Sequence, residues 1–178
     1  VQWSPDGDSL FCLTDSGREF SAPARLDVAS RELTYLVTPD LEIDEATVDP
    51  TGRRLAYALN RDGEAEIVIR ELDSGTERSV MGLPPGALYT YWQAGLAWDP
   101  AGERLAISWT ASRAGPNVFV AVLATGEARQ VTHAGGLEVT ADDLTEPEHV
   151  SFPTFDGRPI PALFYRAPGQ TGNGPCVV

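Results

Sequence analysis

The hydrophobic residues of this chain form short runs that are separated by polar turns containing Gly or Pro. Three of these turns share one pattern, at residues 4–7, 49–52 and 99–102. In each turn Ser or Asp stands first, Pro second and Gly fourth. These are the preferences of a type I turn, in which Pro fixes the φ angle of the second residue. An apolar residue precedes each turn and an apolar run follows it, so each copy predicts a strand, a tight turn and a second strand.

The three turns recur at a nearly constant spacing. The distance is 45 residues from Trp3 to Val48 and 50 residues from Val48 to Trp98. A period of roughly 40 to 50 residues is typical of propeller blades. Alignment on the turns predicts second, third and fourth strands in each unit, at 10–13, 24–28 and 33–38, at 55–59, 65–72 and 77–81, and at 105–109, 117–123 and 128–133. The predicted units are residues 1–45, 46–90 and 91–136.

Two of the predicted third strands are almost continuously apolar, at residues 66–69 and 118–123. A sheet with one wet face would instead alternate apolar and polar residues. Both strands are therefore expected to be covered on both faces, as happens when four-stranded antiparallel sheets stack as blades around an axis. A β-sandwich also contains regular turns, but it does not account for a turn motif repeated at a fixed period. The predicted fold is all-β, with about three antiparallel four-stranded β-propeller blades in an incomplete ring.

The repeat ends after Gly136, and the pattern of the chain changes. Residues 137–148 are acidic and polar and predict a linker or a short capped turn. Two apolar runs, 149–153 and 160–165, then bracket the dipeptide Asp156-Gly157, which predicts a β-hairpin. Prolines within these runs remove donors of the strand ladder, so we expect the hairpin at the edge of a sheet. Residues 175–178 have the pattern of the beginning of a buried strand.

Composition narrows the choice of partners. The chain has 178 residues, a formal net charge of −13 and 42% hydrophobic residues. A nucleic-acid partner would require clustered Lys and Arg, so none is expected. No apolar run approaches the length of a membrane span, so no membrane partner is expected either. The chain begins at Val1 without a charged and apolar leader, which gives a cytoplasmic location and a piece of a longer protein as expectations.

The residue types that hold metals or cofactors do not form a recognisable pattern. The two cysteines, Cys12 and Cys176, lie far apart in apolar contexts and are expected to be small buried hydrophobic residues. No spacing fits a zinc site. The acidic residues Asp40, Glu42, Asp44 and Glu45 could hold a hard cation or a substrate's amino terminus. A solvated loop is the simpler interpretation, and no metal or cofactor is predicted.

Three aromatic residues are the candidates for substrate contact: Tyr89, Tyr91 and Trp92. They lie in the longer of the two connections between units, and aromatic residues are common in binding pockets. Packing between blades is the alternative, because such residues also fill cores. The two histidines, His133 and His149, have no paired nucleophile in the sequence, and a general base needs its proton within hydrogen-bond reach. We therefore expect no direct chemical role for either.

The second part of the chain resembles a known family. The residues that carry the resemblance are Pro147-Glu148, Val150-Ser151-Phe152, Asp156-Gly157, Ile160-Pro161-Ala162 and Gly174-Pro175-Cys176-Val177-Val178. In this order, after three propeller-type units, they resemble the prolyl oligopeptidase family of serine peptidases, in its acylaminoacyl-peptidase and dipeptidyl-peptidase-like branch. The turn repeat itself is shared with non-catalytic propellers, so the hairpin and closing strand are more diagnostic. The resemblance implies a β-propeller followed by an α/β-hydrolase domain whose first residues are 149–178.

The resemblance also implies a function. Members of this family are serine hydrolases that cleave short peptides or acylated amino acids, and the propeller limits access to the site. Their oxyanion-hole stretch, nucleophile, acid and base all follow the closing strand. This segment alone is therefore expected to be catalytically inert, with a short peptide as the substrate of the full-length protein.

Two alternatives remain open: a non-catalytic, TolB-like propeller scaffold that binds partners, and a truncated reading frame without activity. The sequence after the closing strand would distinguish them. Because closed propellers have about four to eight blades, three units leave open blade faces, which predict a homo-oligomer.

Overall fold

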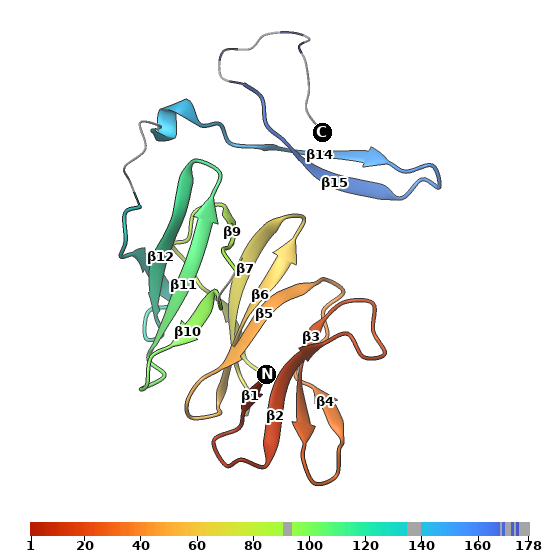
Figure 1. Cartoon of the computed structure of the whole chain (residues 1–178), viewed down its shortest axis with the longest axis vertical. Coiled ribbons are helices and arrows are strands. Elements are labelled where there is room, and N and C mark those ends of the chain that lie inside the picture. Colours follow the sequence, from red (N-terminus) through yellow and green to blue (C-terminus); the bar gives the residue numbers. More distant parts are fainter. Residues whose placement is uncertain (91–93, 135–139, 168, 170–171, 173, 175–178) are drawn as a thin grey trace.

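The structure is a computed structural model that describes residues 1–90, 94–134, 140–167, 169, 172 and 174. These residues form three antiparallel sheets and a separate two-stranded hairpin, and there is no α-helix among them. The three sheets stand side by side, and the hairpin lies across one end of them (Figure 1). The predicted all-β fold of antiparallel four-stranded sheets is confirmed, and the described sheets do not close a ring.

The strands of each sheet follow one another in chain order. The first sheet contains β1 (Gln2–Trp3), β2 (Ser9–Thr14), β3 (Ala22–Asp27) and β4 (Leu33–Tyr35). The second sheet contains β5 (Ile43–Val48), β6 (Arg54–Arg61), β7 (Glu64–Glu71) and β8 (Glu77–Ser79). The third sheet contains β10 (Leu96–Trp98), β11 (Arg104–Ala111), β12 (Ala114–Val122) and β13 (Glu127–Gln130). It also includes β9 (Gly86–Leu88), which pairs with the far end of β11.

The fourth strand of each sheet is shorter than the sequence pattern predicts. β4, β8 and β13 end at Tyr35, Ser79 and Gln130, before the predicted ends at 38, 81 and 133. The reason is visible after β8, where Met81 already pairs with the third sheet. Its N–H donates to the Gly126 carbonyl at 2.9 Å, and its own carbonyl accepts from the Ala128 N–H at 2.7 Å. Just beyond the three strand ends, Leu36, Val80 and Val131 each still donate to a carbonyl of the third strand of their own sheet, and Met81 is the residue that leaves the second sheet for the third.

Two hydrophobic layers separate the three sheets. The layer between the first and second sheets contains Phe11, Val37, Ile43, Val48, Leu55, Tyr57, Leu59 and Val68. The layer between the second and third sheets includes Ala56, Ala58, Ile67, Ile69, Leu105, Ile107, Trp109 and Phe119. The second sheet is thus covered on both faces, which confirms the prediction for residues 66–69.

For residues 118–123, the described part of the chain covers one face only, and the prediction for the other face stays a prediction. Along β12, buried Phe119 and Ala121 alternate with partly exposed Val118, Val120 and Val122. The valines point to the outer face of the third sheet, on which no described sheet packs. An apolar residue at every position therefore does not guarantee that both faces are covered within the described part of the chain.

The three repeated turns have the same geometry. In each, the N–H of the Gly donates to the carbonyl of the first residue at 3.0 Å, from Gly7 to Ser4, Gly52 to Asp49 and Gly102 to Asp99. All three glycines have a positive φ, between 67° and 78°. At Gly102 the requirement for glycine is also steric, because a Cβ would lie 2.9 Å from Asp49 Oδ2.

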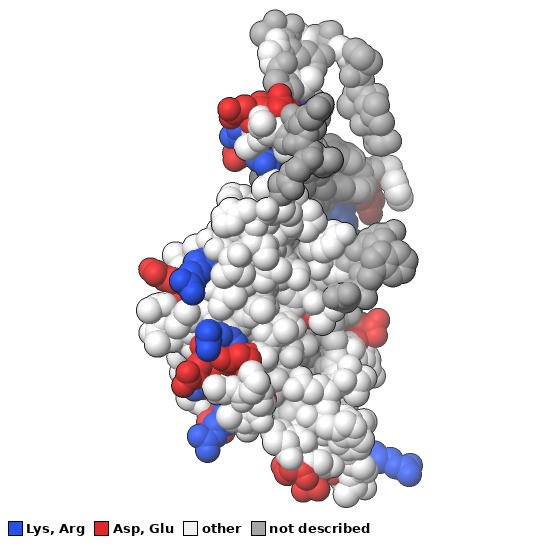
Figure 2. All heavy atoms as spheres, turned by 60° about the vertical axis from the view of Figure 1, so that its left-hand side comes forward, with Lys and Arg blue, Asp and Glu red and all other residues white. Residues whose placement is uncertain are grey.

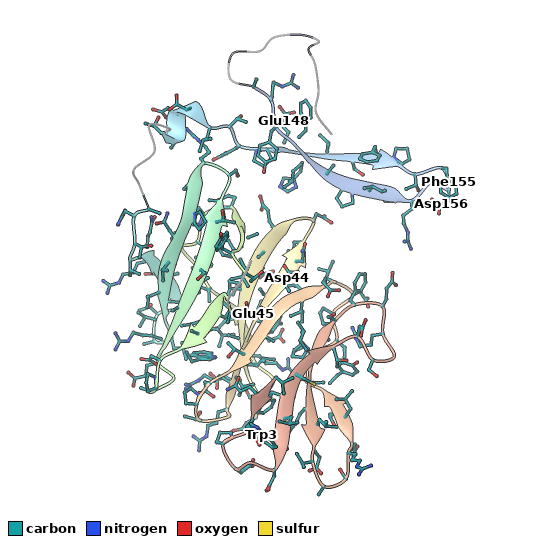
Figure 3. All side chains as sticks on the ribbon, in the orientation of Figure 1. Trp3, Asp44, Glu45, Glu148, Phe155 and Asp156 are labelled. Atoms are coloured by element: carbon teal, nitrogen blue, oxygen red, sulfur yellow. The ribbon has the colours of Figure 1, made fainter. Side chains whose placement is uncertain are left out.

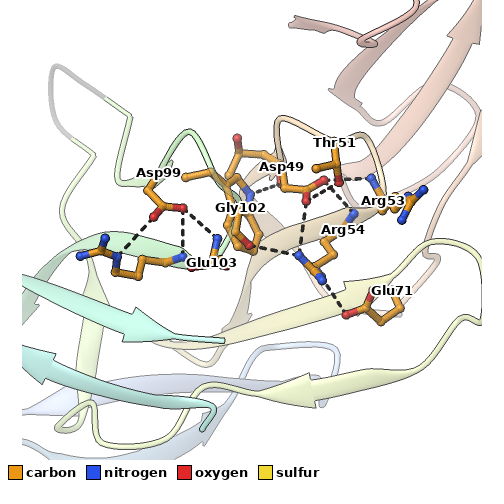
Figure 4. A network of polar contacts seen from close by, with 11 residues as sticks. Asp49, Thr51, Arg53, Arg54, Glu71, Asp99, Gly102 and Glu103 are labelled. Atoms are coloured by element: carbon orange, nitrogen blue, oxygen red, sulfur yellow. Dashed lines mark hydrogen bonds and ion pairs between the residues drawn. The ribbon is translucent and has the colours of Figure 1, made fainter. Parts of the chain in front are cut away.

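The first residue of each turn also holds the strand that follows. Asp49 Oδ1 accepts the N–H groups of Arg53 and Arg54 at 2.9 and 3.0 Å (Figure 4). Asp99 Oδ1 accepts those of Glu103 and Arg104 at 2.8 and 3.1 Å. In these two turns the carboxylate therefore binds the N–H groups of the two residues that follow the turn, in addition to the backbone hydrogen bond within it.

Polar contacts also join each sheet to the next. Arg54 Nη1 donates at 3.1 Å to the carbonyl of Gly102, in the turn of the third sheet, while Arg54 Nε pairs with Glu71 at 3.0 Å within the second sheet (Figure 4). The Gln2 side chain donates to the Val48 carbonyl at 2.8 Å and accepts from its N–H at 3.0 Å. These bonds fix the relative register of neighbouring sheets, which apolar packing alone leaves free to slide.

The hairpin consists of β14 (Glu148–Pro153) and β15 (Pro159–Phe164), joined by a turn that contains Asp156 and Gly157. It forms a sheet of two strands, so its prolines stand on edge strands as predicted. A short 3₁₀ helix, η1 (Ala141–Asp143), precedes it. The N–H and hydroxyl of Thr140 donate to Asp143 Oδ2 at 2.8 and 2.7 Å, so η1 is a capped turn of the predicted kind. The strand predicted at 175–178 lies outside the described residues.

Candidate functional site between the hairpin and the sheets

The hairpin rests on the ends of the sheets that are opposite the repeated turns (Figure 1). Its central support is the turn between β6 and β7, where Asp62 and Gly63 have φ angles of 55° and 94°. Two successive positive φ angles favour an Asp-Gly pair, because Asp tolerates this region and Gly is free in it. The Asn60 side chain accepts the Gly63 N–H at 3.0 Å and closes the turn. The turn therefore has a defined conformation, and the hairpin rests on it.

Three contacts hold the hairpin segment on this end of the sheets. His149 Nε2 lies 3.1 Å from Glu64 Oε1, on the first residue of β7. Leu163, which pairs with His149 across the hairpin, lies over Gly63, where a Cβ would be 3.5 Å from its Cδ1. At the other end, Arg113 Nε and Nη2 donate to the Ala141 carbonyl at 2.9 and 2.8 Å. The hairpin segment is thus joined to the sheets by one ionisable pair, one apolar contact and two hydrogen bonds from one guanidinium group.

A groove of about 630 Å³ runs between the hairpin and the sheets. It is lined by Phe20, Leu41, Glu42, Asn60, Asp62, Gly63, Pro161, Ala162 and Leu163. Most of the wall is apolar, and among the described residues that line it the ionisable groups are the carboxyl groups of Glu42 and Asp62. A groove of this size and composition suits a small or extended ligand with an apolar portion.

The predicted acidic cluster does not converge on one point. Glu42 Oε2 accepts the Ser21 N–H at 3.1 Å, and Asp44 accepts from the Asn60 side chain at 3.3 Å. Glu45 turns to the third sheet, where its two oxygens accept the N–H groups of Gly95 and Leu96 at 2.7 and 2.9 Å. Figure 3 shows Asp44 and Glu45 on β5, in the middle of the three sheets. Among the described residues, no group of three or more His, Cys, Asp or Glu could hold a metal ion, which leaves the cation interpretation without support.

Of the three aromatic candidates, only Tyr89 is described, since Tyr91 and Trp92 lie outside the described residues. Tyr89 follows β9, and its N–H donates to the Ser108 carbonyl at 2.9 Å. The residue is 46% exposed within the described part of the chain. β9 and β10 share one edge of β11, and Tyr89 stands between them at that edge.

The histidines and cysteines have different surroundings. His149 contacts Glu64, a partner that sequence reasoning missed, because the two residues lie 85 positions apart and only the docked hairpin brings them together. His133 lies beyond the end of β13 and is exposed. Cys12 is a free thiol and only partly buried, so the expectation of full burial is wrong for it, and Cys176 lies outside the described residues.

Electrostatic effects on this end of the sheets favour charged carboxylates. The Ser79 hydroxyl and then the Arg61 side chain hydrogen-bond to Glu66 and lower the pKa of its carboxyl group below the usual 4.5. At the tip of the hairpin, a hydrogen bond from the Thr154 hydroxyl lowers the pKa of Asp156 in the same way. Figure 3 shows Phe155 and Asp156 at this tip, away from the sheets. In both cases the hydrogen bonds favour the ionised form of the carboxyl group.

Solved structures provide a comparison with known proteins. A puromycin hydrolase matches 97% of this chain with a TM-score of 0.74 and 25% identity. A prolyl endopeptidase matches 92% of the chain with a TM-score of 0.73 and 16% identity. The fold is that of the propeller region of prolyl oligopeptidase-family enzymes. The resemblance predicted from the sequence is thus confirmed, and this chain spans 26% and 24% of the length of those two chains.

A propeller of a different class also matches. A TolB-type protein from Agrobacterium tumefaciens has a TM-score of 0.58 and 16% identity, over 72% of this chain and 46% of its own. By sequence, no family model and no curated protein matches the chain. No helix in the described part of the chain has the length and hydropathy needed to cross a bilayer. The prolyl oligopeptidase-type fold therefore rests on the structural matches, which include nearly all of the chain.

Proposed function

We propose that this chain is the part of a serine hydrolase in which the propeller meets the catalytic domain, and that the enzyme cleaves short peptides or acylated amino acids. In this proposal residues 1–136 belong to the propeller, 137–148 connect the domains and 149–178 begin the α/β-hydrolase domain. The sheets would restrict access to the catalytic site, and the catalytic groups would come from another part of the protein.

The observation that carries the proposal is the extent of the structural match. The hydrolases match 97% and 92% of the chain, whereas the TolB-type propeller matches 72%. The difference is similar to the share of the chain that follows residue 134. A scaffold built only of blades has no need for the hairpin, and here the hairpin is held on the sheets by His149, Leu163 and the contact of Arg113 with Ala141.

The first experiment tests for a serine hydrolase. The complete protein that contains this segment is treated with a fluorophosphonate probe, which reacts with activated serines. We expect covalent labelling, together with hydrolysis of short peptide p-nitroanilides and of an N-acetyl amino-acid p-nitroanilide. A folded protein that is neither labelled nor active would contradict the proposal and favour the TolB-like scaffold.

The second experiment tests access and the role of Tyr89. Short peptides should be cleaved, and the same sequence within a folded protein should not. Tyr89→Ala should raise KM for short peptides by about tenfold, the loss expected from one aromatic contact. Tyr165→Ala is the control, because Tyr165 has a similar exposure, 54%, but follows the hairpin. Equal KM values for the two variants would remove Tyr89 from the substrate site.

The cytoplasmic location expected from the sequence stays a prediction. Cell fractionation of the producing organism, followed by detection of the fluorophosphonate-labelled protein, would test it directly.

A further inference from the structure

A β-bulge turns the side chain of Glu45 toward the third sheet. In β5, Ile43 pairs with Leu59 of the neighbouring strand. Glu45, two positions later, pairs with Ala58, so Asp44 is an extra residue in the strand. Without it, Glu45 would share the face of Ile43, toward the first sheet. The bulge instead places Glu45 beside Ala58, which lies in the layer between the second and third sheets.

The Glu45 carboxylate holds the beginning of β10. Its two oxygens accept the N–H groups of Gly95 and Leu96 at 2.7 and 2.9 Å. The φ angle of Gly95 is not positive, so the reason for glycine here is space. A Cβ at Gly95 would lie 3.1 Å from each of three neighbours: Glu45 Oε2, Leu88 Cδ2 and Thr90 Cγ2. The ends of β9 and β10 therefore meet at the Glu45 carboxylate.

Residues 89–95, which we call the β9–β10 loop, begin and end on one residue of β11. The Tyr89 N–H donates to the Ser108 carbonyl at 2.9 Å, and the Ser108 N–H donates to the Gly95 carbonyl at 2.7 Å. Loops of about 6 to 16 residues whose ends lie close together are frequently functional. Tyr89 is the first residue of this loop, so its position depends directly on how the two ends are held.

Glu45 is used differently from the carboxylates on the surface. In the space-filling view, acidic and basic side chains lie next to one another over the sheets (Figure 2). The ion pair of Arg70 and Glu77, at 2.7 Å, is of this surface type. Among the described residues, the hydrogen-bond partners of Glu45 are instead the two backbone N–H groups of the third sheet. The Glu45 carboxylate therefore fixes the backbone of a neighbouring sheet.

We propose that Glu45 is a positioning residue that holds the β9–β10 loop so that Tyr89 contacts the substrate. This inference rests on the proposed function, in which Tyr89 belongs to the substrate site. Ser108 fixes the loop along β11, and Glu45 fixes it against the second sheet (Figure 3). Glu45 itself touches no substrate, because its two oxygens are bound to the backbone. Its role is to give the loop one position relative to two sheets.

The first test measures the kinetics of the complete protein with short peptide p-nitroanilides. Glu45→Ala removes both acceptors and should raise KM by about fivefold, with kcat changed by less than about twofold. Glu45→Gln keeps one carbonyl acceptor and should give an intermediate KM. Gln2→Ala is the matched control, because the Gln2 side chain makes the same kind of bonds, to Val48, between the first and second sheets. We expect it to leave KM unchanged.

A double-mutant cycle then tests whether Glu45 acts through Tyr89. In a Tyr89→Ala background, Glu45→Ala should raise KM by less than about twofold, because the contact that Glu45 positions is already lost. An active protein in which Glu45→Ala leaves KM unchanged, or raises it equally in both backgrounds, would overturn the inference while the proposed function stands. A folded protein without hydrolase activity would overturn both.

Hydrogen exchange separates positioning from a general loss of structure. Glu45→Ala should speed exchange of the Gly95 and Leu96 amides by about tenfold and leave β6 and β7 unchanged. This measurement needs no substrate, so it does not depend on the proposed function. Faster exchange throughout the second and third sheets would show that Glu45 supports the whole fold, and would overturn its role as a positioning residue.

Discussion

Asp49 and Asp99 occupy the same position in the repeated turn, but their surroundings differ. The Asp49 side chain is fully buried and also lies 3.6 Å from Arg54 Nη1, whereas 22% of the Asp99 side chain is exposed. At Asp99, burial works against the charge, but hydrogen bonds from the Arg104 and Glu103 N–H groups outweigh it and lower the pKa. The same turn chemistry is therefore part of the core in one repeat and part of the surface in another.

This difference predicts unequal effects of the same substitution. Asp49→Ala leaves the N–H groups of Arg53 and Arg54 without their acceptor and removes the ion pair with Arg54, and should lower the free energy of unfolding by about 3 kcal/mol. Asp99→Ala should cost clearly less, because water can replace the lost acceptor. Urea unfolding measures both, with exposed Asp73→Ala as the control. Equal losses for Asp49→Ala and Asp99→Ala would contradict the role of burial.

Glu66 predicts how stability depends on pH. Its pKa in the folded chain is lowered by the Ser79 hydroxyl and by Arg61, so folding favours the ionised form. The resulting stabilisation is present above the ordinary pKa of 4.5 and is lost as pH falls through the lower folded value. The difference in unfolding free energy between the wild type and Glu66→Gln should therefore be largest near pH 7 and shrink below about pH 4.5. If this difference in unfolding free energy grew on acidification, the ionised form of Glu66 would not be the one that stabilises the fold.

At the scale of elements, β9 is the feature that the repeat did not predict. β9 pairs with the end of β11 that β10 leaves unpaired. The buried Trp109 side chain on β11 holds the segment before β9 in place by donating to the Pro84 carbonyl at 3.0 Å. Gly86 lies so close to β11 that a Cβ would overlap the Thr110 carbonyl oxygen. β9 is therefore set by a backbone-to-backbone approach that only glycine permits.

Gly86→Ala should test how closely β9 packs against β11. The added methyl group must push β9 away from β11, at a cost of about 2–3 kcal/mol in unfolding free energy. Gly115→Ala, in β12, is a matched control, because a Cβ there has no neighbour within 4 Å and its φ is not positive. We expect it to change stability by less than about 0.5 kcal/mol. Thermal and urea unfolding would compare them, and equal stabilities would show that β9 is not closely packed.

At the scale of the whole molecule, the sheets and the hairpin are held together in different ways. Two buried layers and repeated polar bonds connect the sheets, whereas the described contacts of the hairpin with the sheets are few and mostly exposed. Regions with few buried contacts open at low cost, independently of global unfolding. We therefore predict that, of the two walls of the groove, the hairpin opens at lower cost than the sheets.

Substitution of each histidine tests whether the hairpin is held less firmly than the sheets. His149→Ala removes the contact with Glu64 and should speed hydrogen exchange in residues 148–164 about threefold, with little change in β6 or β11. His133→Ala is the control, since His133 is exposed and lies beyond β13. Exchange measured by mass spectrometry after peptic digestion would separate the two regions. Faster exchange throughout the sheets would mean that the hairpin contributes to the core.

The local and periodic parts of this protein can be predicted from its amino-acid sequence. Turns such as Asp49–Gly52 depend on residues a few positions apart, and the spacing of three such turns sets the number and order of the sheets. The Asp156-Gly157 hairpin is local for the same reason, as is the capped turn at Thr140 and Asp143. Short-range hydrogen bonds and backbone preferences decide these features, so they can be predicted without a structure.

Which surfaces meet could not be predicted, because it depends on how distant segments pack together. The pairing of His149 with Glu64, the bonds from Glu45 to the third sheet and the early ends of the fourth strands depend on residues far apart in sequence. The continuous apolar pattern of β12 gave no information on whether a further sheet covers Val118 and Val120. A residue's own chemistry shows that burial is favourable, but the position of a distant segment decides whether burial happens.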